Sequence, residues 1–203
     1  MNKKKNVCII TYDILAGGSE LNAKKIIKYI DNNYYWISLG RKRNNNFLNL
    51  QRIKKIKFLN FRVFKISSIL KDLSKFIKNN KINIIYAIGM YPSIIASILK
   101  FRHSYKLIIT RRGVINLTEK LKYFYLFLFI YFCSDKIETN SENIFKKFKR
   151  TFFFRKKIYF INNLIEKNIY QRNAKNTFNK KNVTLGFALN IRPVKDPNLI
   201  KDV

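Results

Sequence analysis

The chain has 203 residues, of which 47% are hydrophobic and 15% aromatic, with only six Gly and three Pro. This composition supplies enough apolar side chains for a folded core and excludes a low-complexity or intrinsically disordered protein. The formal net charge of +31 attracts nucleic acid, anionic lipid and phosphorylated ligands alike, so it does not select one partner.

The most apolar segment is residues 123–133, YFYLFLFIYFC. It is too short to cross a hydrocarbon layer of roughly 30 Å as a helix, so we predict a buried helix or a helix at a membrane surface. The apolar run after Lys5 is too short for a secretory signal, because Asp13 interrupts it. We therefore expect a cytoplasmic protein, with a peripheral location at the inner face of the membrane as a further hypothesis.

The chain is organised around residues 7–30, VCIITYDILAGGSELNAKKIIKYI. The pattern predicts a buried strand, a turn at Gly17 and Gly18, and a helix opened by Ser19. Unpaired N–H groups and the helix dipole favour an anion at such a helix start, and glycine lets a ligand approach the backbone closely. Two glycines before a helix are more often a plain turn, so both interpretations stay open here.

Further strands and helices alternate along the chain. The predicted strands are residues 34–39, 56–60, 82–87, 106–110, 136–139 and 157–161, and the predicted helices are residues 67–79, 93–101, 117–133, 141–150 and 165–172. Such alternation predicts an α/β fold, a Rossmann-like parallel sheet with helices on both faces.

Ligands of parallel sheets bind beyond the carboxyl ends of the strands. In this sequence those ends carry the glycine turn and a set of small, polar and cationic residues, namely Gly89, Arg111, Arg112, Asn140 and Ser141. We predict that they form one rim that suits a phosphate or a sugar. The two arginines would either bind an acceptor phosphate or be solvated charges at a strand end.

The composition changes near the carboxyl end of the chain. Residues 1–172 form the predicted Rossmann-like domain, and residues 173–182, NAKNTFNKKN, are a polar linker. Residues 183–203 begin a new α/β unit with the strand VTLGFAL. One strand cannot bury a core, so we expect these residues to be the start of a second, truncated domain.

Four segments of the chain together resemble the retaining glycosyltransferases of family 4. They are IITYDILAGGSE, INIIYAIGMYPSIIASILK, SDKIETNSENIFKKF and GFALNIRPVKDPNLI, in that order. The resemblance implies a GT-B architecture, in which two Rossmann-like domains face each other across a cleft. The chain would supply the N-terminal, acceptor-side domain, the linker, and the first strand and loop of the domain that binds the nucleotide-sugar.

The resemblance also implies a donor site. Gly17, Gly18 and Ser19 would face the donor phosphates and the transferred sugar, and Lys195 matches a family lysine that contacts the diphosphate. Asn190 is at the position of the usual family arginine, with Arg192 nearby. Fixed cations and helix N–H groups can stabilise a departing diphosphate without a metal or other cofactor, and no Asp-x-Asp motif is present.

The resemblance leaves the catalytic residues unassigned. The family's pair of glutamates belongs to the part that this chain lacks, so we expect the chain alone to be inactive. The leading hypothesis is a truncated glycosyltransferase that uses a UDP- or GDP-sugar, with retention, on a polysaccharide or lipid-linked acceptor.

Two alternatives stay open. One is a non-catalytic basic α/β module that binds nucleic acid or an anionic membrane, and the other is one half of a split enzyme with its C-terminal domain on a separate chain. The aromatic segment 123–133 and the basic segment 146–150 would serve a membrane contact, or would pack as ordinary helices.

Overall fold

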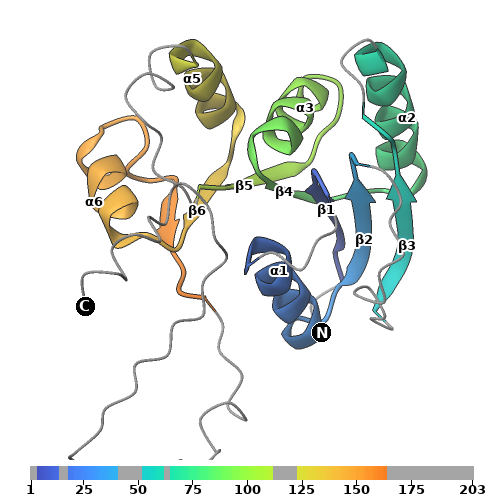
Figure 1. Cartoon of the computed structure of the whole chain (residues 1–203), viewed down its shortest axis with the longest axis horizontal. Coiled ribbons are helices and arrows are strands. Elements are labelled where there is room, and N and C mark those ends of the chain that lie inside the picture. Colours follow the sequence, from blue (N-terminus) through green and yellow to red (C-terminus); the bar gives the residue numbers. More distant parts are fainter. Residues whose placement is uncertain (1–3, 14–17, 41–51, 62–64, 112–122, 164–203) are drawn as a thin grey trace, which may run out of the picture. The chain divides into compact units, whose positions relative to one another are not determined.

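The computed structural model describes residues 4–13, 18–40, 52–61, 65–111 and 123–163, which all belong to one compact unit, residues 1–164. The described residues form a seven-stranded sheet in the order β3-β2-β1-β4-β5-β6-β7, in which every neighbouring pair is parallel. The predicted Rossmann-like α/β fold is therefore confirmed (Figure 1).

The elements follow one another as in the predicted alternation. Their bounds are β1 (Asn6–Thr11), α1 (Gly18–Tyr29), β2 (Asn33–Ser38), β3 (Ile53–Phe58), α2 (Ile66–Asn79), β4 (Ile84–Ile88), α3 (Met90–Lys100), β5 (Lys106–Thr110), α5 (Phe124–Cys133), β6 (Lys136–Thr139), α6 (Glu142–Arg150) and β7 (Ile158–Phe160).

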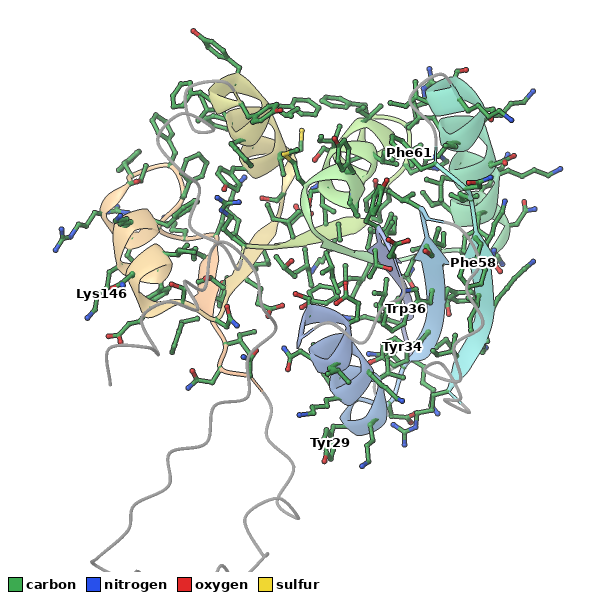
Figure 2. The ribbon with its side chains drawn as sticks, in the orientation of Figure 1. Tyr29, Tyr34, Trp36, Phe58, Phe61 and Lys146 are labelled. Atoms are coloured by element: carbon green, nitrogen blue, oxygen red, sulfur yellow. The ribbon has the colours of Figure 1, made fainter. Side chains whose placement is uncertain are left out.

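Both faces of the sheet are covered, because alternate residues of each central strand point to opposite sides. Cys8 and Ile10 of β1 belong to the larger core, which includes buried residues of α2, α3 and α5. Val7 and Ile9 belong to a second core with Ala23 and Ile27 of α1 and with Tyr34 and Trp36 of β2. Figure 1 shows α1 alone on its side of the sheet, and Figure 2 shows Tyr34 and Trp36 on that side.

Some element boundaries differ from the prediction. The strands 106–110 and 136–139 are confirmed to the residue. Helix α3, however, begins at Met90, so that Pro92 is its third residue and not its predecessor. Proline fits there because its missing N–H has no intrahelical acceptor in the first turn. Similarly, α1 begins at Gly18, so Ser19 already lies in its first turn.

Helix α5 packs one side against the core, as the buried-helix interpretation of the aromatic segment predicts. Ile130 and Tyr131 are buried, whereas Tyr125 is 83% exposed. Within the described segments, the structure contains no helix with the length and apolarity needed to cross a membrane. The predicted helix 165–172, the linker 173–182 and the second unit 183–203 lie outside the described residues.

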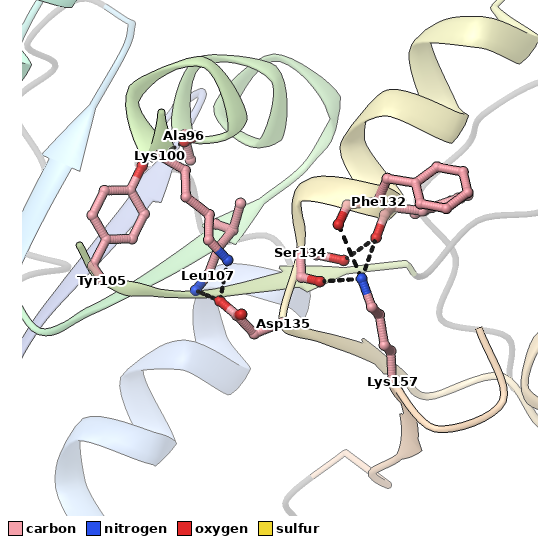
Figure 3. A network of polar contacts seen from close by, with 9 residues as sticks. Ala96, Lys100, Tyr105, Leu107, Phe132, Ser134, Asp135 and Lys157 are labelled. Carbon is pink, nitrogen blue, oxygen red and sulfur yellow. Dashed lines mark hydrogen bonds and ion pairs between the residues drawn. The ribbon is translucent and has the colours of Figure 1, made fainter. Parts of the chain in front are cut away.

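A polar network fixes the connection between α5 and β6 (Figure 3). Asp135 accepts a 2.7 Å hydrogen bond from the Leu107 backbone N–H and pairs with the ammonium group of Lys100. Burial by itself raises the pKa of Asp135, but these bonds and the charges of Lys100 and Lys157 lower it below its ordinary value. Lys157 donates to the carbonyl oxygens of Phe132 (3.0 Å) and Ser134 (2.8 Å), satisfying acceptors at the end of α5.

Candidate functional site

A cavity of about 320 Å³ lies at the carboxyl ends of β1, β4 and β5. The three strand ends form its floor, the first turn of α1 and the start of α3 form part of its wall, and one side of α5 closes it. Its lining residues are Tyr12, Ser19, Glu20, Ile88, Gly89, Met90, Ser93, Ile109, Thr110, Arg111, Phe127, Ile130 and Tyr131. This is the edge of a parallel sheet at which ligands bind.

Gly89 shapes the turn from β4 into α3. Its φ of 98° and ψ of 172° lie in a region that L side chains rarely adopt, so the backbone conformation requires glycine. The Gly89 carbonyl oxygen accepts bonds from the Ser93 backbone N–H (3.2 Å) and the Ser93 hydroxyl (2.6 Å). The turn therefore directs the N-terminus of α3, with its unpaired N–H groups, to the cavity wall.

Arg111 is the only cation among the described residues that line the cavity. Its guanidinium carbon lies 5.0 Å from the centroid of the Phe127 ring, which is a cation–π geometry. Its backbone N–H donates a 2.7 Å hydrogen bond to the carbonyl oxygen of Glu138 on β6. The strand end and the α5 ring thus hold a positive charge at the cavity wall.

Tyr131 of α5 also lines the cavity. Burial raises its pKa, although the nearby Arg111 charge acts in the opposite direction. The phenol is therefore protonated at neutral pH, where it can donate and accept hydrogen bonds. Together with Ser19, Ser93 and Thr110, it gives the cavity hydroxyl groups on several sides. Such groups suit the hydroxyls of a sugar.

The start of α1 brings a helix N-terminus to the cavity, together with the Glu20 carboxylate. Ser19 and Glu20 line the cavity, and they lie in the first turn of a helix. A Cβ atom placed on Gly18 would have no other atom within 4 Å, so the space beside this residue is open. A ligand can therefore approach the backbone of the first turn closely.

The structure brings together part of the predicted site. Ser19, Gly89 and Arg111 line one cavity, and Gly18 is next to it at the start of α1. Asn140 and Ser141 are not among the lining residues. The remaining predicted residues, Gly17, Arg112, Asn190, Arg192 and Lys195, lie outside the described residues.

Asn140 and Ser141 have local structural bonds. The Asn140 amide donates to the Asn163 side-chain oxygen (3.1 Å), and the Ser141 hydroxyl accepts from the Ile144 N–H (3.4 Å) as the N-cap of α6. The predicted helix start at Ser141 therefore coincides with its N-cap.

Sequence reasoning missed several lining residues. Tyr12 and Thr110 could have been found, because they lie at strand ends like the predicted rim residues. Phe127 and Tyr131 could not, since the segment around them is apolar on every side and its periodicity does not indicate which side faces the sheet.

Neither a family model nor a curated protein sequence matches the chain. Solved structures do match. Anabaena HepE, in complex with UDP and glucose, is similar over 81% of this chain and 46% of its own, with 14% identity and a TM-score of 0.62. The lipopolysaccharide outer core galactosyltransferase WaaB (apo form) is similar over 80% and 46%, with 15% identity and a TM-score of 0.59.

A UDP-N-acetylglucosamine 2-epimerase is also similar, over 79% of this chain and 49% of its own, with 18% identity and a TM-score of 0.56. The chain spans about half the length of these structures or less. At such identities the likeness shows the fold alone, a Rossmann-like α/β domain that these glycosyltransferase and epimerase structures share.

Proposed function

We propose that this chain is the acceptor-side domain of a GT-B glycosyltransferase of the retaining family 4 type. It moves a sugar from a UDP- or GDP-sugar to a polysaccharide or lipid-linked acceptor at the cytoplasmic face of the membrane. The observation that carries the proposal is the cavity at the carboxyl ends of β1, β4 and β5, with Arg111 and the α1 N-terminus on its wall.

The size and polarity of the cavity support a sugar with an anionic group as the occupant. Its volume of about 320 Å³ lies at the lower end of the roughly 300–1,000 Å³ typical of small-ligand pockets. In the proposed arrangement the hydroxyls of Ser93 and Tyr131 bind sugar hydroxyls. The guanidinium of Arg111 binds a phosphate of the acceptor, since charge-assisted bonds of this kind are strong.

The donor side of the proposal extends beyond the described residues. The glycine turn, Gly17 and Gly18 with Ser19, faces the donor phosphates, and the loop with Asn190, Arg192 and Lys195 supplies opposing polar and cationic groups. The proposed boundaries are the domain 1–172, the linker 173–182 and the start of the donor domain at 183–203. Donor binding then needs a complete second Rossmann-like domain, in a longer polypeptide or on a separate chain.

Two measurements test the proposal. Calorimetry with UDP- and GDP-sugars is performed on this chain alone and on the chain co-expressed with the coding region downstream of Val203. We expect binding only in the second case, and then transfer of radiolabelled sugar to a membrane or glycan fraction. Tight binding by this chain alone would contradict the two-domain donor site, and absence of binding in both cases would contradict the assignment.

The similarity to a UDP-N-acetylglucosamine 2-epimerase supports a second candidate function, because that enzyme has the same fold. The reaction product distinguishes the two candidate functions. A transferase releases UDP or GDP in step with labelling of an acceptor, whereas an epimerase changes the configuration of the sugar and labels no acceptor.

A further inference from the structure

A surface of exposed phenylalanines and cations lies beside the end of α5. We define this aromatic–basic surface by Phe132, Phe152, Phe153, Arg155 and Lys156. The three phenylalanines are 54%, 70% and 65% exposed, respectively. Their rings contact one another, with centroid distances of 6.0 Å from Phe132 to Phe153 and 5.7 Å from Phe152 to Phe153. Residues from α5 and from the turn after α6 therefore form one continuous apolar surface.

The turn after α6 is anchored, so the exposed rings are held outward. Phe154 is only 7% exposed, and its ring packs against Tyr131 (5.5 Å) and Phe132 (5.6 Å). Lys157 donates to carbonyl oxygens at the end of α5, as Figure 3 shows. With Phe154 and Lys157 fixed inward, Arg155 and Lys156 between them are exposed. Phe152 and Phe153, which come just before Phe154, also face solvent, and the core of the described domain does not use them.

The surrounding charge is positive. Residues 146–157, KKFKRTFFFRKK, contain seven Lys or Arg and four Phe, and residues 143–163 contain no Asp or Glu. Lys146 pairs with Glu142 on α6 and points away from the sheet (Figure 2). The guanidinium carbon of Arg155 lies 5.0 Å from the centroid of the Phe152 ring. The cations are therefore mixed with the aromatic rings.

We propose that the aromatic–basic surface docks onto an anionic lipid bilayer. The phenylalanine rings enter the boundary between headgroups and acyl chains, and the surrounding cations face the lipid phosphates. The chemistry disfavours single-stranded nucleic acid, because base stacking needs free ring faces. Arg155 lies over the Phe152 ring, and the Phe152 and Phe153 rings meet edge to face at 82°.

This inference names a surface for the membrane contact of the proposed glycosyltransferase, but it does not require sugar transfer. Vesicle binding is measured on the 203-residue chain without a donor or an acceptor. Absence of vesicle binding would therefore not contradict the proposed sugar transfer, and absence of sugar transfer would not contradict membrane docking.

The test is co-sedimentation of the chain with two kinds of vesicle. One contains phosphatidylcholine alone, and the other also contains about 30% phosphatidylglycerol, which gives it an anionic surface. We expect binding to the anionic vesicles that weakens with salt. The pair Phe152→Ser and Phe153→Ser should lower the partition coefficient about tenfold, because two inserted rings are lost. The pair Arg155→Gln and Lys156→Gln should lower it several-fold and reduce its salt dependence.

Two matched pairs serve as controls. Lys71→Gln with Lys75→Gln on α2 removes the same charge from another exposed site, and Tyr29→Ser with Ile30→Ser removes exposed apolar side chains beyond the surface (Figure 2 labels Tyr29). We expect both to bind anionic vesicles nearly as the unaltered chain does. An equal loss in the Lys71 and Lys75 pair would show attraction by net charge alone, and an equal loss in the Tyr29 and Ile30 pair would show unspecific apolar binding. Either result would overturn the proposal.

A second measurement does not depend on loss of binding. The chain has one tryptophan, Trp36, which is fully buried. In the variant Phe153→Trp we expect a blue shift of the added fluorescence on anionic vesicles, because the indole leaves water. The absence of a blue shift at saturating lipid would overturn the proposed insertion. The proposal would also be overturned if the double variant Phe152→Ser, Phe153→Ser lost oligonucleotide binding but kept vesicle binding.

Discussion

The guanidinium group of Arg111 packs over the ring of Phe127, with 5.0 Å between the guanidinium carbon and the ring centroid. The two residues come from the end of β5 and from α5, and both line the cavity. A cation held by an aromatic ring keeps its N–H groups available at the ring edge. The pair therefore presents a fixed positive charge to the cavity without an acidic partner neutralising it in this contact.

We predict that Arg111→Gln weakens the binding of inorganic pyrophosphate, used as a probe of the cavity, by about tenfold or more, since hydrogen bonds to charged groups contribute about 1.5–3 kcal/mol. Arg111→Lys should recover only part of the affinity, because lysine keeps the charge but lacks the planar fork. Calorimetry measures the affinity of both variants for pyrophosphate. Arg102→Gln, an exposed arginine after α3, is the control. Equal affinity in Arg111→Gln and the unaltered chain would contradict the role of Arg111.

The two described glycines of the rim should respond differently to alanine. Gly89→Ala places a side chain at a φ of 98°, and we predict a loss of about 1–3 kcal/mol in the free energy of unfolding. The loss comes from the backbone conformation, because the nearest atom to the new Cβ is Pro92 Cδ at 3.9 Å.

Gly18→Ala is the matched control, since its Cβ would meet no atom within 4 Å. Alanine at this helical position should be neutral or stabilising by up to about 1 kcal/mol. Urea unfolding of both variants checks the prediction. A larger loss in Gly18→Ala than in Gly89→Ala would contradict it.

Helix α6 should depend on its cap. Its sequence is strongly basic, and Ser141 provides a side-chain acceptor for the Ile144 N–H. We predict that Ser141→Ala lowers the free energy of unfolding by about 1 kcal/mol, the typical contribution of an N-cap. Ser67→Ala, an exposed serine inside the first turn of α2, should change it by less than about 0.5 kcal/mol. Thermal or urea unfolding distinguishes the two, and equal effects would argue against capping.

The sequence predicts the fold well for a physical reason. The runs around β4, β5 and β6 are apolar because parallel strands are covered on both faces, and glycine or polar residues follow them closely. The pattern therefore locates the strand ends. Because the carboxyl ends of parallel strands share one edge of the sheet, it also predicts that Gly89 and Arg111 lie at that edge. The sequence predicts a start of α3 that is too late, because proline is tolerated at any position of the first turn.

The side-chain directions at the site could not be predicted in the same way. Helix α5 is apolar on every side, so its sequence does not reveal that Phe127, Ile130 and Tyr131 face the cavity whereas Tyr125 faces solvent. That choice is made by tertiary packing against α3 and the sheet. Nor does the sequence indicate that the Asn140 side chain bonds to Asn163, because this contact joins residues that are distant along the chain.

The last prediction concerns the pH dependence of the Asp135 network (Figure 3). Burial acts to raise the pKa of Asp135, but the bonds from Lys100 and the Leu107 N–H, with the charge of Lys157, bring the folded-state pKa below its ordinary value. A carboxyl with a lowered folded-state pKa stabilises the fold above its unfolded pKa of about 3.9. This contribution is lost as the pH falls through the lower, folded-state pKa.

We therefore expect Asp135→Asn to be less stable than the unaltered chain at about pH 6 in urea unfolding, and the gap to narrow as the pH falls below the unfolded-state pKa of about 3.9 towards the lower, folded-state pKa of Asp135. The amide can still accept from the Leu107 N–H, so the variant removes mainly the charge. Asp72→Asn is the control, because Asp72 is exposed and its ion pair with Lys57 spans 4.0 Å. A gap for Asp135→Asn that stays constant between these pH values would show that its carboxylate charge does not stabilise the connection between α5 and β6.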